Sequence, residues 1–345
     1  MSGRRVTAFL ASTRARILLR VGVALAVLAA VVWRVGAEPF VRGLLAVDLR
    51  AVIVVAGLTA LATVAASWRW RVIANRLGAR ISLPRAVAMY YRSQFLNTVL
   101  PGGVLGDVHR ALAHGSTSGD VARASRAVAI ERTAGQVVQV AITLVVVAFV
   151  GAEFAGQVLL VVIVFLVAIA VACTIAAAST RLRAVLRREL SELRAGIGSR
   201  PALAQVCAAS VVVVACHVTA FEIAVVSVGA HAPALQLASL ALVVLLGASI
   251  PLNVGGWGPR EGVAGWAFAT AGLGSAPGVA ASTTFGVLTM IALAPGAVIA
   301  LCGAWRARGH GATRVAPHPA AQAVPLRVAP QASVLTATTR GGRVS

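Results

Sequence analysis

The chain contains no lysine and little charge of any kind. Charged residues make up 12% of its 345 positions, about half of the ~25% that is usual in soluble globular domains. Hydrophobic residues make up 59%, and the mean hydropathy is +0.89. This composition argues against a soluble enzyme or a soluble binding module and indicates a protein embedded in a membrane.

Motifs for catalysis, cofactors and metals are also missing. The sequence has no H-E-x-x-H, D-D-x-x-D or G-x-S-x-G motif, so neither a metal-dependent enzyme nor a serine hydrolase is predicted. No two cysteines have C-x-x-C spacing, which predicts neither a zinc site nor a disulfide framework. We therefore expect no enzymatic activity, no catalytic residue, no cofactor and no metal.

Long apolar runs are what the chain has instead. Several uncharged runs reach the ~20 residues that cross a ~30 Å hydrocarbon core as a helix. The short alternating segments of a membrane β-barrel do not occur. The sequence therefore predicts an all-α, polytopic membrane protein with about eight transmembrane helices. One or two re-entrant segments, broken by glycine, are expected in addition.

The formal net charge of +21 comes from arginine. In a soluble protein it would suggest nucleic-acid binding, but here the arginines concentrate in loops and termini, which indicates membrane orientation and contact with anionic lipid. Residues 69–92 are predicted to form a basic cytoplasmic segment after a span that ends at Trp68. Nearly all arginines fall on one predicted side. We predict a multi-pass protein of a bacterial-type plasma membrane, with both termini cytoplasmic and no nucleic-acid partner.

Composition divides the chain into three parts. Residues 1–16 are predicted to form a basic cytoplasmic N-terminus, residues 17–305 the transmembrane domain, and residues 306–345 a disordered cytoplasmic tail. Within the domain, residues 181–200 combine many arginines with leucines at helical intervals. That pattern predicts a basic amphipathic helix on the cytoplasmic face, with a plain solvated linker helix as the alternative.

A glycine-rich stretch that begins at Phe95, FLNTVLPGGVLGDVHR, interrupts the apolar runs. Broken backbone at membrane depth is tolerated only where protein or a water-filled cavity surrounds it. Basic flanks on both sides predict a re-entrant hairpin that turns at Pro-Gly-Gly. The free amides of Gly102 and Gly103 are suited to anions, and Asp107 and Arg110 follow directly. The alternatives are a glycine hinge and a substrate site.

A second glycine-rich stretch, IPLNVGGWGPREG, begins at Ile250. It ends with Arg260 and Glu261 directly after Pro259, where a helix is expected to restart. One interpretation is structural: a proline in the first turn, followed closely by glutamate, favours the N-terminus of a helix. The other is a functional one, because arginine matches a lipid phosphodiester through its bidentate fork.

Three further ionisable residues lie inside or beside apolar runs. Glu131 and Arg132 have two interpretations: the start of a helix, with Glu131 favoured by the helix dipole, or an inward-turned Arg132 that pairs with a lipid phosphate or with Asp107. Glu222 lies in the middle of a predicted span and needs a partner or water. Arg132, Arg260 or His217 would serve.

The motifs, in chain order, are Phe95-x-Asn97, Pro101-Gly102-Gly103-x-x-Gly106-Asp107-x-x-Arg110, Glu131-Arg132-x-x-Gly135 and Gly255-Gly256-x-Gly258-x-Arg260-Glu261-Gly262. Together they resemble the lysylphosphatidylglycerol synthase transmembrane-region family, the flippase-like membrane domain of multiple peptide resistance factor proteins. Leu105 departs from the pattern, which often has glycine there. The resemblance implies lipid translocation between leaflets. It also implies that a soluble aminoacyl-transferase domain, usual in full-length members, is missing after Trp305, so we expect no synthesis of aminoacyl lipid.

The first functional hypothesis is therefore a flippase-like translocator of a phospholipid or lipid-linked headgroup. Its partners would be membrane lipids with anionic headgroups. One alternative is a membrane transferase that acts on a lipid-linked substrate with Asp107, Glu131 and Glu261 as acid–base candidates. Another is a non-transporting partner of a separate membrane or cytoplasmic glycosyl- or aminoacyl-transferase. The candidate substrate-binding residues are Asn97, Gly102, Gly103, Asp107, Arg110, Glu131, Arg132, Glu222, Arg260 and Glu261.

Overall fold

The computed structural model describes residues 35–100, 103–149, 191–249 and 257–302, with the single positions 29, 32, 33, 156 and 189. Of the two units into which the chain divides, Met1–Gly303 and Ala304–Ser345, only the first contains described residues. The predicted first span before Trp33, the predicted span 158–178 and most of the predicted amphipathic helix 181–200 lie outside these ranges. Residues 191–197 of that last segment are helical.

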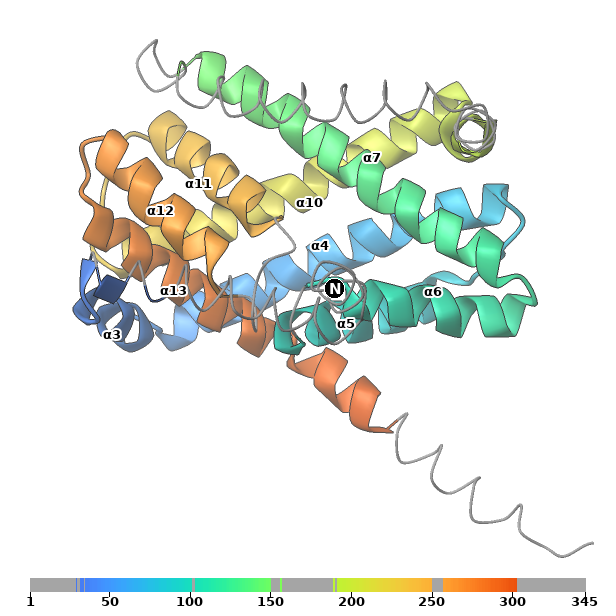
Figure 1. Ribbon diagram of the computed structural model, residues 1–345, viewed down its shortest axis with the longest axis horizontal. Coiled ribbons are helices and arrows are strands. Elements are labelled where there is room, and N and C mark those ends of the chain that lie inside the picture. Colours follow the sequence, from blue (N-terminus) through green and yellow to red (C-terminus); the bar gives the residue numbers. More distant parts are fainter. Residues whose placement is uncertain are drawn as a thin grey trace, which may run out of the picture. The chain divides into compact units, whose positions relative to one another are not determined.

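All regular elements in the described ranges are helices, which confirms the all-α fold class for this part of the chain (Figure 1). In chain order they are α3 (Glu38–Leu45), α4 (Leu49–Arg76), α5 (Leu83–Val99), α6 (Leu105–Ser118), α7 (Val121–Ala148), α10 (Arg200–Ser227), α11 (Ala234–Ala248), α12 (Pro259–Thr270) and α13 (Ser275–Ala292). Residues 294–302 are also helical.

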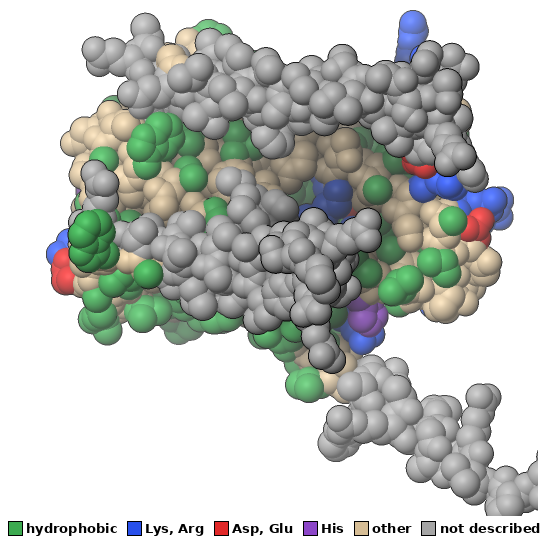
Figure 2. Space-filling model, viewed as in Figure 1, with side chains coloured by type: hydrophobic (Ala, Val, Ile, Leu, Met, Phe, Trp, Pro, Cys, Tyr) green, Lys and Arg blue, Asp and Glu red, His purple; other side chains and the backbone are tan. Residues whose placement is uncertain are grey.

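Four of the described helices are long and apolar enough to cross a membrane: α4, α7, α10 and α13. The first three have 28 residues each, about 42 Å of helix at 1.5 Å per residue. Large hydrophobic side chains are exposed on the outside of these helices, among them Ile53, Val137 and Val226 at 63%, 62% and 55% (Figure 2). Such surfaces suit lipid rather than water, so the chain is a multi-pass membrane protein.

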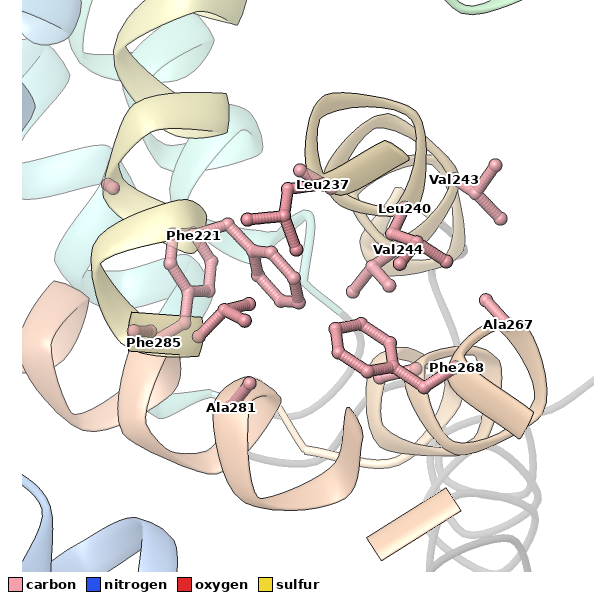
Figure 3. Packing of buried hydrophobic residues seen from close by; sticks show 14 of the residues in the cluster. Phe221, Leu237, Leu240, Val243, Val244, Ala267, Phe268, Ala281 and Phe285 are labelled. Carbon is pink, nitrogen blue, oxygen red and sulfur yellow. The ribbon is translucent and has the colours of Figure 1, made fainter. Parts of the chain in front are cut away.

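Two apolar clusters hold the helices together. In the first, α10, α12 and α13 contribute Phe221, Phe268 and Phe285, whose rings meet edge to face at centroid distances of 6.3 and 5.6 Å around Phe221 (Figure 3). In the second, Trp70 and Ile73 of α4 pack with residues of α5, α6 and α7. Helices α4 and α10 contribute residues to both clusters and pack on each other (Figure 1).

The predicted hairpin at the first glycine-rich stretch forms a helix–break–helix. Helix α5 ends at Val99, α6 begins at Leu105, and the two helices pack together. Gly103 takes a positive φ of 61°, a conformation that favours glycine. Gly106 faces the backbone oxygen of Ser93 so closely that a Cβ atom would collide with it. At the second stretch, α11 ends at Ala248 and α12 begins at Pro259, and residues 250–256 between them lie outside the described ranges.

One predicted boundary is wrong. The span expected to end at Trp68 continues as α4 to Arg76, so Arg69 lies within the helix and not in the segment that follows it. Arg69 is only 5% exposed. A partner from another helix, described below, is the physical reason why a charged residue is tolerated there.

The close approach of α5 and α6 predicts a specific sensitivity. Gly106→Ala should lower the free energy of unfolding by about 1–3 kcal/mol, because the new methyl group pushes α6 away from the Ser93 carbonyl. Gly57→Ala is the matched control: a Cβ atom added there would have nothing within 4 Å, so the change should be neutral or raise stability by up to ~1 kcal/mol. Thermal unfolding of both purified variants in detergent measures this. Equal melting temperatures would contradict the predicted contact.

Candidate functional site

Glu131 of α7 is the centre of a buried ionic cluster. Its side chain is fully buried. Its Oε1 accepts hydrogen bonds from Arg69 Nε at 3.0 Å, Arg69 Nη2 at 2.5 Å and the Tyr90 hydroxyl at 3.1 Å. Its Oε2 accepts one from Arg110 Nη2 at 2.9 Å. A carboxylate removed from water is costly unless it is paired and hydrogen-bonded, and here both oxygens are.

The prediction that Glu131 and Arg132 begin a helix is wrong. Helix α7 begins at Val121, about three turns earlier, with Asp120 as the N-cap that accepts from the Arg123 amide at 2.9 Å. The helix dipole at the N-terminus therefore does not explain Glu131. The inward-facing interpretation holds, because Arg132 pairs with Asp107.

Arg69 was not identified as a site residue by the sequence analysis. Besides its two bonds to Glu131, it donates from Nη1 to the Ser210 hydroxyl of α10 at 2.9 Å. Gly135 lies one turn beyond Glu131, and a Cβ there would approach the Arg69 guanidinium to 2.8 Å. The glycine of the Glu131-Arg132-x-x-Gly135 motif therefore makes room for this arginine.

Arg110 of α6 is 1% exposed and lies between two aromatic rings. The centre of its guanidinium is 4.6 Å from the ring centroid of Trp70 and 4.3 Å from that of Tyr90. Nη2 donates to Asp107 Oδ1 at 3.0 Å and to Glu131. Nε and Nη1 have no hydrogen-bond partner among the described residues. The two ring faces stabilise the cation in their place.

Asp107 joins three helices. Its Oδ1 accepts from Ser93 Oγ of α5 at 3.0 Å and from Arg110, and its Oδ2 accepts from Asn97 Nδ2 at 3.1 Å and pairs with Arg132. Asn97 also accepts from the Gly106 amide at 2.7 Å, which binds the start of α6 to α5. The geometry makes Asp107 a residue that positions arginines.

A second ionic cluster lies at the start of α12. Glu261 is fully buried and accepts from Arg260 Nε at 3.0 Å and Nη2 at 2.6 Å through Oε1. Its Oε2 accepts from the Gly258 amide at 2.7 Å. Ser282 of α13 accepts from Arg260 Nε at 3.0 Å and donates to Glu261 at 3.2 Å. Gly286 leaves space for the guanidinium, because a Cβ there would overlap it. Glu261 therefore has two roles: it caps the N-terminus of α12, and it positions the Arg260 guanidinium.

Two cavities lie beside these clusters, and a hollow with basic side chains is visible on one face (Figure 2). The larger cavity, of about 650 Å³, is lined by residues of α4, α5, α6, α7, α10 and α11. The smaller cavity, of about 270 Å³, reaches to α12 and α13. Gln94, Arg132 and His217 line both. Arg260 lines the smaller one.

The predicted residues thus separate into groups. Asn97, Asp107, Arg110, Glu131 and Arg132 form one connected cluster, Arg260 and Glu261 form the other, and Gly103 lines both cavities. Gly102 lies outside the described residues.

Glu222 is not brought to the site. It is half-buried on α10, lines neither cavity, and has no hydrogen bond or ion pair with another described residue. Within the described ranges, no three His, Cys, Asp or Glu side chains gather in a way that would hold a metal ion.

Sequence reasoning also missed the neutral members of the site. Tyr90, Ser93 and Ser210 donate to, or accept from, its charged groups. Single hydroxyl residues in apolar runs carry no pattern that distinguishes them from packing residues, so no signal was present to find them.

A glutamate-to-glutamine substitution should cost far more stability in the buried cluster than at an exposed ion pair. Glu131→Gln should destabilise the protein by about 3–5 kcal/mol, because it leaves Arg69 and Arg110 buried without their counter-charge. Glu38→Gln removes an exposed ion pair with Arg42 and should cost less than ~1 kcal/mol. Thermal unfolding in detergent, followed by circular dichroism, compares the two. Losses of similar size would contradict the central place of Glu131.

Comparison with known proteins adds one finding. The family model described as the lysylphosphatidylglycerol synthase transmembrane region matches residues 17–296, which include both ionic clusters. No curated protein and no solved structure matches the chain. The match spans most of the 345 residues, so this chain belongs to the lysylphosphatidylglycerol synthase transmembrane-region family and is a lipid-related integral membrane protein.

Proposed function

We propose that the chain is a flippase-like translocator that moves a phospholipid or lipid-linked headgroup between leaflets. The observation that carries this proposal is that Arg132 and Arg260 both line the smaller cavity. Asp107, in the first turn of α6, pairs with Arg132 and holds it in place. Arg260 lies in the first turn of α12, which begins at Pro259. Discontinuous helices that meet at a central cavity are the usual construction of a transporter's substrate site.

The charge of the two clusters favours an anionic headgroup. The arginines Arg69, Arg110, Arg132 and Arg260 outnumber the carboxylates Asp107, Glu131 and Glu261 by one. The side chain of Arg132 is 41% exposed, in contrast to the fully buried Arg110. A lipid phosphate that enters the smaller cavity would meet guanidinium groups suited to bidentate bonding.

A transferase is the less favoured alternative. Its acid–base candidates would be Asp107, Glu131 and Glu261, and each of these carboxylates is bonded to at least one arginine. Their oxygens already accept bonds from these guanidinium groups and are therefore engaged before any substrate arrives. The arrangement therefore suits positioning better than proton transfer, and we propose no enzymatic activity. A separate transferase as a partner stays a prediction from the sequence.

The membrane arrangement is part of the proposal. About eight spans with the two glycine-rich stretches as re-entrant segments would bring non-helical backbone to membrane depth, and Gly103 of the first stretch lines both cavities. The arginine distribution supports a cytoplasmic location of both termini in a bacterial-type plasma membrane.

Lipid movement in proteoliposomes tests the function. With tail-labelled fluorescent phosphatidylglycerol, wild-type protein should expose inner-leaflet probe to dithionite faster than empty vesicles do. Arg132→Gln/Arg260→Gln should slow this at least about tenfold, because it removes two charge-assisted contacts to the headgroup.

Arg123→Gln is the matched control, since Arg123 forms a half-exposed ion pair with Asp120 and lines neither cavity. It should transport at the wild-type rate. Equal rates for the control and the double variant, with both proteins folded, would refute the proposed site.

The topology gives a second test. Green fluorescent protein fused to either terminus should fluoresce, and alkaline phosphatase at the same positions should be inactive, because both termini are cytoplasmic. The linker around Glu153 contains no arginine, so we expect it outside; phosphatase placed there should be active and serves as the control. Phosphatase activity at either terminus would overturn the proposed orientation.

A further inference from the structure

Two glutamines of α7 face the larger cavity. Gln136 and Gln139 lie about one and two turns beyond Arg132, and both line the cavity. Neither side-chain amide has a hydrogen bond with another described residue. An unbonded amide on a membrane-spanning helix is unfavourable unless water or a ligand bonds it. The pair therefore marks a polar track that continues from the arginine along α7.

Gln94 faces the same cavity from α5. Its Oε1 accepts from the Thr63 hydroxyl at 2.9 Å, so its amide group keeps its donor hydrogens for another partner. The cavity thus contains three neutral amides, from two helices, beside the cationic side chains of Arg69 and Arg132. Amides both donate and accept, which is the pattern that a hydroxyl group matches.

No described carboxylate offers an unbonded oxygen to either cavity. Asp107 is the single acid that lines either cavity among the described residues, and its two oxygens already bond Ser93, Asn97, Arg110 and Arg132. Of the ten acids in the sequence, Glu131 and Glu261 are buried against arginines, and Glu222 lines neither cavity. An ammonium group in the larger cavity would meet Arg69 and Arg132 without an uncommitted carboxylate from the described residues.

We propose that the larger cavity takes an uncharged, hydroxyl-bearing headgroup, glycerol or a sugar, whose phosphodiester lies between Arg132 and Arg260, and that it disfavours headgroups with an ammonium group. This rests on the proposed function, in which the cavities hold a lipid headgroup. The 650 Å³ cavity is within the ~300–1,000 Å³ range of small-ligand sites. The amides supply attraction for hydroxyl groups, and the arginines supply repulsion against ammonium.

A binding series on the purified full-length protein in detergent tests the assignment. The probes are short-chain phosphatidylglycerol, phosphatidylmethanol, phosphatidylethanolamine and a short polyprenyl phosphate hexose. Phosphatidylmethanol has the same phosphodiester charge as phosphatidylglycerol but lacks the glycerol hydroxyls. Phosphatidylglycerol or the hexose lipid should bind at least about fivefold more tightly than phosphatidylmethanol, and phosphatidylethanolamine should bind most weakly. Whichever hydroxyl-bearing probe binds more tightly identifies the source of the headgroup.

Substitutions of the amides provide the decisive comparison. Gln136→Leu/Gln139→Leu should reduce the affinity for the preferred hydroxyl-bearing probe to that for phosphatidylmethanol, and leave phosphatidylmethanol binding unchanged. Gln139→Glu should raise the affinity for phosphatidylethanolamine relative to phosphatidylglycerol about tenfold, because it adds a carboxylate to the cavity. Gln205→Leu, at an exposed position of α10 outside both cavities, should change nothing.

The outcomes separate this inference from the proposed function. Equal affinities for phosphatidylglycerol, the hexose lipid and phosphatidylmethanol, or tight binding of phosphatidylethanolamine to wild type, would overturn the headgroup assignment even if lipids move in vesicles. The expected order of affinities without lipid movement would refute translocation and leave the headgroup assignment standing. If the leucine variant does not fold, the lipid series on wild-type protein decides.

Discussion

The arrangement of the helices depends on the buried carboxylate of Glu131. Glu131 belongs to α7, its oxygens receive donors from α4, α5 and α6, and Arg69 extends the cluster to α10 through Ser210. Four helices thus meet at one carboxylate, and a fifth joins them through Arg69. Apolar helix faces in a membrane have no hydrophobic drive to associate, because lipid is as apolar as they are. Directional bonds to a buried charge can fix one arrangement of such helices, since any other would leave an ion unpaired.

The arginines of the site divide into two kinds by what surrounds them. Arg69 and Arg110 are enclosed by carboxylates, hydroxyls and aromatic rings and stabilise the helix packing, although Arg69 also lines the larger cavity. Arg132 and Arg260 each have one carboxylate partner and line the smaller cavity. Arg110 supports Arg132, because both arginines pair with the same Asp107. This support fixes the position of the Arg132 guanidinium and leaves part of it available for a ligand.

The sequence predicted the charged part of this site better than its surroundings. Asp107, Arg110, Arg260 and Glu261 were found because ionisable residues beside broken apolar runs are rare and have few structural explanations. Arg69 was missed because a helix that extends past the hydrocarbon core looks, in sequence, like a span followed by a basic loop. Glu222 was predicted as a site residue for the same reason, because acids inside apolar runs are rare, yet it lines neither cavity. Arg69 and Glu222 are distinguished only by which distant helices pack around them, and the pattern of hydrophobic residues along the sequence does not specify that packing.

The pairing of Arg132 with Asp107 also bears on how a translocator releases its cargo. Transport requires that a site bind its substrate well enough to admit it and weakly enough to let it leave. A free arginine at membrane depth would hold a phosphate very tightly, because the interaction is strong where water is excluded. With Asp107 already bonded to Arg132, an entering phosphate must share the guanidinium or displace the carboxylate. In the proposed translocator, the carboxylate that repels the substrate's charge would therefore be the group that keeps the site reversible, which would explain an acid beside the proposed phosphate-binding arginine.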